Sequence, residues 1–189
     1  MSEIGHNKGP TMEPGAGWRR FAWRKARADL LPKLPIEVVR LRVKRARELG
    51  LDYKSYASIR AANGRDVVAF LFSSNALRVV PASAAVAPAR AEKLLALKQC
   101  ERLAFVQPPL SPELVLQMNP EILEATGPAP TLLDNWPAIS AKVANLTIDR
   151  GVPRDGVVVI GDAALDREWL LAGRLAGYVP AERYFGATP

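Results

Sequence analysis

A short run of β-branched residues that stops at a Gly-Asp pair constrains the fold of this chain more than any other segment. The run is Val157–Ile160, and Gly161 and Asp162 follow it directly. Such a run is typical of a strand that is buried on both faces of a parallel sheet. Open α/β sheets place their sites at the carboxyl ends of these strands. The segment therefore predicts an α/β domain that holds the Asp162 carboxylate at the carboxyl edge of its sheet.

Further strands are expected wherever short apolar runs lack a helical period. Val67–Phe72 is continuously apolar, Leu103–Gln107 is a second short run, and Tyr178–Val179 is a candidate edge strand. Because helical segments separate these runs, we expect an α/β fold with a small, mainly parallel sheet of three to four strands flanked by helices. Val67–Phe72 and Val157–Ile160 should be neighbouring central strands, since both are apolar throughout.

Prolines, glycines and small polar residues mark the ends of the expected helices. Asp52 is expected to cap one helix, and Gly64 is expected to stop it. The Gly127–Pro130 segment reads as a loop. The expected helices cover residues 18–31, 36–49, 53–63, 88–98, 137–150 and 165–176, with two short ones after Ser111-Pro112 and Asn119-Pro120.

The positive charge of the chain is confined to its N-terminal third. Residues 1–65 carry fifteen Lys/Arg against six Asp/Glu, a net of +9, whereas residues 66–189 carry eleven against thirteen, a net of −2, giving the total of +7. We expect a disordered leader at 1–17, a basic helical N-terminal arm at 18–64 and an α/β domain at 65–189. This asymmetry suggests a nucleic-acid partner, or an arm that docks on an acidic protein surface.

Tryptophan alternates with arginine on one face of the first expected helix, at four-residue spacing. An indole flanked by guanidinium groups is typical of proteins that bind single strands or phosphate backbones. The alternative is a helix docked on the α/β body, with its arginines solvated or paired. The expected contact residues for nucleic acid or a protein partner are Arg19, Trp23, Arg27, Arg42, Lys44 and Arg45.

The composition excludes several classes of protein. No apolar run approaches the roughly eighteen residues of a membrane span, and the polar N-terminus lacks the apolar core of a secretory signal. Cys100 is the only cysteine, so an internal disulfide is impossible and a reducing cytoplasmic location is expected. His6 is the only histidine, which leaves no Ser-His-Asp triad in the ordered region and no zinc site.

From Lys142 onward, the order of elements resembles the C-terminal half of the haloacid dehalogenase-like (HAD) phosphohydrolase superfamily. Members of that family carry a helical lysine, an apolar strand, a Gly-Asp pair and a second aspartate four residues later. The matching elements here are Lys142, Val157–Ile160, Gly161-Asp162 and Asp166. The resemblance implies that the two aspartates hold magnesium and that Lys142 neutralises a phosphoryl group.

The chain departs from this family where the nucleophile is expected. The family's first strand ends in an Asp-x-Asp element, but Leu71 and Ser73 occupy those positions here, and Gln107 replaces a Ser or Thr after the second strand. We therefore expect a non-catalytic α/β binding module with a degenerate HAD-like site, acting through its arm on nucleic acid or a protein partner. The alternative is an active magnesium-dependent, phosphatase-like enzyme centred on Asp162 and Asp166.

Each candidate residue of this edge also has a purely structural interpretation. The two aspartates can cap the helix that follows them, and the lysine can lie on a solvated helix face. The polar residues after Val67–Phe72 can donate to a phosphate or simply form a turn. The candidate phosphate-site residues are Ser73, Ser74, Asn75 and Lys142.

Overall fold

The computed structural model describes residue 18, residue 22 and residues 34–186 of the chain. The expected disordered leader, residues 1–17, and nearly all of the expected helix over residues 18–31 lie outside the described residues. Within the described part of the chain, no helix combines the length and apolar character that crossing a membrane requires.

The chain divides into two compact units, Met1–Val39 and Arg40–Pro189. The second unit contains the whole α/β fold together with residues 40–64, which carry part of the basic N-terminal charge. Its helices, with the one that crosses the unit boundary, are α2 (Ile36–Glu48), α3 (Tyr53–Asn63), α4 (Pro88–Leu95), α5 (Pro112–Met118), α6 (Trp136–Ile148), α7 (Asp166–Gly173) and α8 (Ala181–Phe185).

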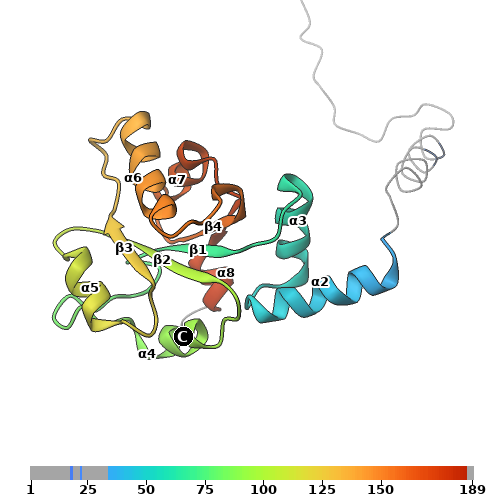
Figure 1. Cartoon of the computed structure of the whole chain (residues 1–189), viewed down its shortest axis with the longest axis horizontal. Helices are drawn as coiled ribbons and strands as arrows, with labels where there is room; N and C mark the ends of the chain where they lie inside the picture. Colours follow the sequence, from blue (N-terminus) through green and yellow to red (C-terminus); the bar gives the residue numbers. More distant parts are fainter. Residues whose placement is uncertain (1–17, 19–21, 23–33, 187–189) are drawn as a thin grey trace, which may run out of the picture. The chain divides into compact units, whose positions relative to one another are not determined.

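A single parallel sheet forms the centre of the second unit, in the strand order β3-β2-β1-β4-β5 (Figure 1). The α/β class is confirmed, but the sheet has five strands rather than the expected three to four. Its strands are β1 (Ala69–Ser73), β2 (Glu101–Val106), β3 (Ala125–Pro128), β4 (Val157–Gly161) and β5 (Gly177–Pro180).

The two central strands, β1 and β4, are the ones expected from their apolar sequences. They pair in parallel from Ala69 opposite Val157 to Phe72 opposite Ile160, and every residue of both strands is buried. A strand covered on both faces tolerates polar side chains poorly, so the uninterrupted apolar runs belong in this position. The strand order changes direction here: the chain runs from β1 outward to β3, then returns to β4 on the other side of β1.

Alternate residues of these strands supply two separate cores, one on each face of the sheet. Phe70 and Phe72 pack with residues of α2, α3, α4, α5 and α8 on one face. Ala69 and Leu71 pack on the other face, which α6 and α7 cover side by side (Figure 1). There the Trp169 indole of α7 lies edge-on to the Phe105 ring of β2. The period-two pattern of a strand thus produces a three-layer fold.

The ends of α3 follow the expected capping residues. Asp52 accepts the backbone N–H of Ser55 at 2.9 Å, and its side chain therefore satisfies a donor that the first turn leaves unpaired. Gly64 ends the helix in the left-handed region, with φ of 75°, where a glycine avoids the steric cost of a Cβ.

Two local expectations between β2 and α6 are wrong. No helix follows Asn119-Pro120: Asn119 is the C-cap residue of α5, and its buried amide donates to the carbonyl oxygens of Ala84 and Val115 at 2.8 and 2.7 Å. The segment expected as a loop contains the end of β3. Gly127 lies against the Phe105 ring, and Pro128 is tolerated because β3 is an edge strand.

Candidate functional site

The loop after β4 presents Asp162 at the carboxyl edge of the sheet, as the sequence predicts. The backbone at Gly161 lies so close to its neighbours that an added Cβ would be 2.6 Å from the Asp166 Cβ and 2.7 Å from the Tyr178 ring. Glycine at this position therefore permits the close approach of β4, β5 and α7. The Asp162 carboxylate forms an ion pair with Arg78, at 3.3 Å between Oδ2 and Nη1.

Asp166 has a different environment from Asp162, although both come from one loop. Its side chain is fully buried, and its Oδ2 accepts the backbone N–H groups of Asp162 and Ala163 at 2.8 and 3.1 Å. These bonds fix the turn between β4 and α7, so Asp166 has a structural role. It is not the expected helix cap, because the N-cap residue of α7 is Leu165 and forms no side-chain cap hydrogen bond. Its Oδ1 is buried and has no hydrogen-bond partner among the described residues.

The residues at this edge do not fit a magnesium ion. One oxygen of Asp166 is already used by two backbone donors, and Asp162 is paired with a guanidinium. Among the described residues, no group of three or more acidic, cysteine or histidine side chains is arranged to hold a metal. Magnesium sites rely on carboxylate oxygens that are open to the ion and its waters, so the magnesium expectation has no geometric support here.

The end of β1 forms a turn. Leu71 is fully buried in the core that α6 and α7 cover. Ser73 Oγ accepts the backbone N–H of Ala76 at 3.1 Å, and Ser74 Oγ exchanges hydrogen bonds with Gln107 at 3.1 Å. Asn75 is exposed. The two serine hydroxyls are therefore occupied by the protein, and neither Leu71 nor Ser73 supplies a nucleophilic carboxylate.

Lys142 does not join this edge with Asp162. Its ammonium lies 2.8 Å from Asp134 Oδ2, in the segment between β3 and α6, and 3.5 Å from the carbonyl oxygen of Ala129. The hydrogen bond from Lys142 lowers the pKa of the Asp134 carboxyl to about 2. Because the Lys142 ammonium is engaged by Asp134 and Ala129, the family-based pairing of Lys142 with the aspartates is not formed.

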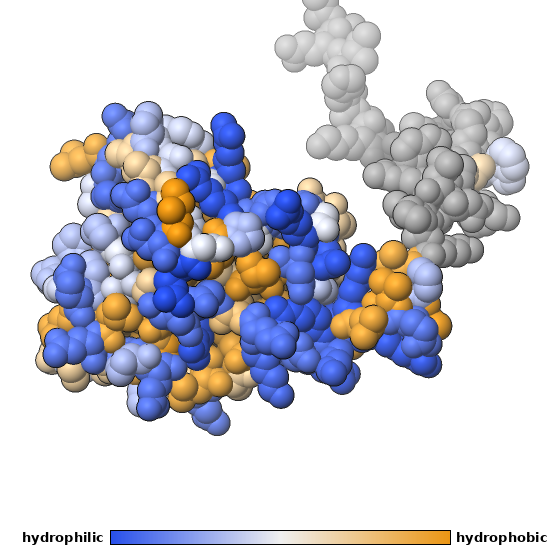
Figure 2. Space-filling view, viewed as in Figure 1, coloured by the Kyte–Doolittle hydropathy of each residue, from blue (hydrophilic) through white to orange (hydrophobic). Residues whose placement is uncertain are grey.

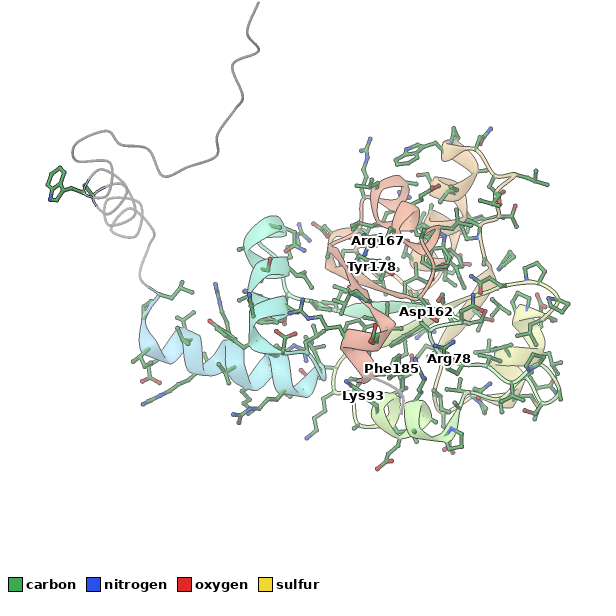
Figure 3. All side chains as sticks on the ribbon, turned by 180° about the vertical axis from the view of Figure 1, so that it is seen from behind. Arg78, Lys93, Asp162, Arg167, Tyr178 and Phe185 are labelled. Carbon is green, nitrogen blue, oxygen red and sulfur yellow. The ribbon has the colours of Figure 1, made fainter. Side chains whose placement is uncertain are left out.

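Basic side chains that the sequence reasoning missed gather around Asp162. Figure 3 shows Arg167 and Tyr178 on one side of Asp162, and Arg78 on the other. The Arg167 guanidinium lies 5.0 Å from the centre of the Tyr178 ring. Arg90 of α4 is buried and donates to the Ala76 carbonyl oxygen, and its burial lowers its pKa. No sequence signal marked these arginines, because only the strand order brings them to one edge.

Arg45, one of the described arm residues, forms hydrogen bonds within the fold. Its guanidinium donates to Asp66 and to the carbonyl oxygens of Val67, Lys98 and Gln99, all at 2.9–3.0 Å. Arg45 therefore anchors α2 to the sheet and is not available to a partner.

Three of the other basic residues of α2 behave differently. Lys44 and Arg47 are exposed, Arg42 is partly exposed, and no described residue forms an ion pair with any of these three. Figure 2 shows hydrophilic surface on α2 next to a hydrophobic patch. Leu41 of the same helix is also exposed. The other expected contact residues, Arg19, Trp23 and Arg27, lie outside the described part of the chain.

Comparison with family models, curated proteins and solved structures finds no match. The site is therefore interpreted from its own geometry. At the carboxyl edge, Asp162 is paired with Arg78, and the Arg167 guanidinium lies over the Tyr178 ring. The hydroxyl groups of Ser73 and Ser74 are hydrogen-bonded within the protein. It provides no acid, base and nucleophile in mutual contact within the described residues.

Cys100 lies apart from this edge. Burial raises the pKa of its thiol to about 12, so the reactive thiolate is scarce at neutral pH. Cys100 packs against the core on one face of the sheet.

Proposed function

We propose that this protein is a non-catalytic α/β binding module that binds nucleic acid through its basic N-terminal arm, residues 18–64, and that α2 is the described helix of this arm that makes the contact. The observation that carries the proposal is a set of three basic side chains of α2, Arg42, Lys44 and Arg47, that form no ion pair with any described residue. They lie in the third of the chain that holds all of the excess positive charge. The α/β body serves as the scaffold that anchors this helix.

The non-catalytic part of the proposal rests on the carboxyl edge. We interpret this edge as a degenerate HAD-like site, because the positions expected to carry aspartates hold Leu71 and Ser73. Leu71 is buried and Ser73 is hydrogen-bonded to backbone, so neither can attack phosphorus. The alternative, a magnesium-dependent phosphatase-like enzyme, needs Asp162 and Asp166 as open ligands, and their contacts with Arg78 and the backbone oppose this.

The choice of nucleic acid over an acidic protein rests on the spacing of charge. Residues 18–47 hold eleven of the twenty-six Lys/Arg of the chain. A polyphosphate backbone repeats its charge every few ångströms, and binding releases condensed counterions for each phosphate that is neutralised. A long run of closely spaced cations matches that repeat. An acidic protein surface would offer fewer and more dispersed partners.

The test compares two double variants that remove the same charge. Lys44→Gln with Arg47→Gln neutralises exposed residues of α2, whereas Arg154→Gln with Arg174→Gln neutralises residues near the start of β4 and the end of α7. Binding of a labelled single-stranded oligonucleotide is followed by fluorescence anisotropy. The α2 variant should bind about tenfold more weakly at low salt, and the control variant should bind like the wild type.

Equal weakening in both variants would mean that only net charge matters, and it would contradict the assignment to α2. Binding of an acidic protein but no oligonucleotide by the wild type would replace nucleic acid with a protein partner.

A further inference from the structure

A small cavity lies between α3, the edge strand β5 and α8, away from the loop that holds Asp162. Its volume is about 190 Å³. Sites for whole drug-sized ligands occupy about 300–1,000 Å³, so this cavity suits a single small chemical group. The lining residues that matter for its chemistry are Lys54, Ser55 and Ser58 of α3, Tyr178 and Pro180 of β5, and Arg183 of α8.

Two cations line this cavity, one from each of two helices. Lys54 and Ser58 lie four residues apart, so they share one face of α3, while Arg183 comes from α8. Among the described residues that line the cavity there is no carboxylate. An ammonium, a hydroxyl and a guanidinium therefore provide hydrogen-bond donors around one small space.

Asp52 pairs with Arg183 of this cavity, but most of the hydrogen bonds that Asp52 accepts come from α3. Asp52 accepts the Ser55 hydroxyl at 2.6 Å and the Ser55 backbone N–H at 2.9 Å, and the hydroxyl hydrogen bond is the main cause of its lowered pKa. Its contact with Arg183 is longer, at 3.3 Å, and about half of each side chain is exposed. The Arg183 guanidinium thus keeps donors that can turn toward the cavity, while the Ser55 hydroxyl is already committed.

We propose that this cavity binds the terminal phosphate of a phosphate monoester. A monoester carries nearly two negative charges at neutral pH and three acceptor oxygens. Lys54 and Arg183 supply two positive charges, and Ser58 supplies a hydroxyl donor. A phosphodiester within a nucleic-acid backbone carries one charge and must leave the cavity on two sides, so it fits the pocket less well.

A second, larger cavity adjoins the first and gives room for the remainder of such a ligand. Its volume is about 330 Å³, and Tyr178 and Pro180 line both cavities. Arg167 lies over the Tyr178 ring in this second cavity, and Figure 3 shows the two side chains together. Glu182 adds a carboxylate that can accept hydrogen bonds from the ligand, whereas Asp162 is already paired with Arg78. The larger cavity therefore takes a polar, uncharged or weakly cationic group attached to the phosphate.

Isothermal titration calorimetry on the full chain tests this proposal, with inorganic phosphate, adenosine 5′-monophosphate and adenosine as probes at constant ionic strength. The wild type should bind both phosphate compounds, and adenosine should bind at least about tenfold more weakly than its monophosphate, because hydrogen bonds to the charged phosphate are lost. Lys54→Gln and Arg183→Gln should each weaken phosphate binding about tenfold. Lys98→Gln removes the same charge outside the cavity and should leave binding unchanged.

A second experiment distinguishes the two possible sources of the terminal phosphate, a nucleic-acid end and a small molecule. If the source is the end of a nucleic-acid strand, a 5′-phosphorylated oligonucleotide should bind more tightly than its 5′-hydroxyl form, and Lys54→Gln should abolish that difference. If the source is a small molecule, the two oligonucleotides should bind alike while the monophosphate binds as above.

The proposal is independent of the function assigned to α2. Lys44→Gln with Arg47→Gln should leave phosphate binding intact even where it weakens oligonucleotide binding. Equal affinities for adenosine and its monophosphate, or a Lys98→Gln variant that loses as much affinity as Lys54→Gln, would overturn the phosphate site.

Discussion

At the scale of single residues, Asp162 and Asp166 show how one sequence motif divides into two roles. Asp166 is buried and holds the backbone of the β4–α7 turn, whereas Asp162 is exposed and pairs with Arg78. Four-residue spacing suggested a shared cavity for both carboxylates. The burial of Asp166 cannot be read from spacing, because it depends on the close contact at Gly161.

Removing the Asp166 carboxylate should destabilise the fold. Asp166→Ala leaves two backbone N–H groups without their acceptor beside a buried space, and we expect a loss of about 2–3 kcal/mol in the free energy of unfolding. Asp162→Ala, the control, loses only a partly exposed ion pair and should cost less than about 1 kcal/mol. Urea denaturation measures both, and equal effects would contradict the assigned role of Asp166.

We expect the carboxyl edge of the sheet not to catalyse the hydrolysis of phosphate esters. With magnesium present, the wild type should hydrolyse an aryl phosphate no faster than its Asp162→Asn variant, since no aspartate lies where a phospho-enzyme would form. Release of the aryl alcohol, measured by absorbance, checks this expectation. Magnesium-dependent activity that the Asp162→Asn variant lacks would favour the enzymatic alternative.

At the scale of elements, one arginine ties α2 to the sheet in addition to the apolar packing of that helix. Arg45 bonds to Asp66, which also accepts the Tyr56 hydroxyl at 2.7 Å. Burial alone would raise the pKa of Asp66, but the hydrogen bond from Tyr56 and the charge of Arg45 outweigh it, and the pKa is lowered. The attachment of α2 therefore depends on a charged Asp66.

This attachment should fail in acid. A lowered carboxyl pKa stabilises the fold above the ordinary value of 3.8, and that stability is lost as the pH falls through the lower folded value. Arg45→Ala should destabilise the protein by about 2 kcal/mol at neutral pH, with a smaller difference in acid once Asp66 is protonated. The control Arg47→Ala, on the exposed side of α2, should cost under about 0.5 kcal/mol. Thermal unfolding across pH measures both; a difference that persists in acid would argue against the ion pair.

At the scale of the whole molecule, the sequence predicts the centre of the fold better than its margins. The apolar runs of β1 and β4 suit only strands that are covered on both faces, and both strands lie inside the sheet. Strand β3 was missed because Ala125–Pro128 contains Gly and Pro and has no apolar run. The arginines around Asp162 were missed because residues 78, 90 and 167 meet only through the order of the strands, which local sequence does not encode.

The salt dependence of oligonucleotide binding by the full chain tests the central claim most directly. About five phosphate contacts to a single strand predict a slope near −3.5 for log affinity against log salt concentration, with little dependence on base sequence. Fluorescence anisotropy of several labelled oligonucleotides, titrated with protein at a series of salt concentrations, gives this slope. Unchanged anisotropy at micromolar protein and roughly 50 mM salt would contradict the nucleic-acid function.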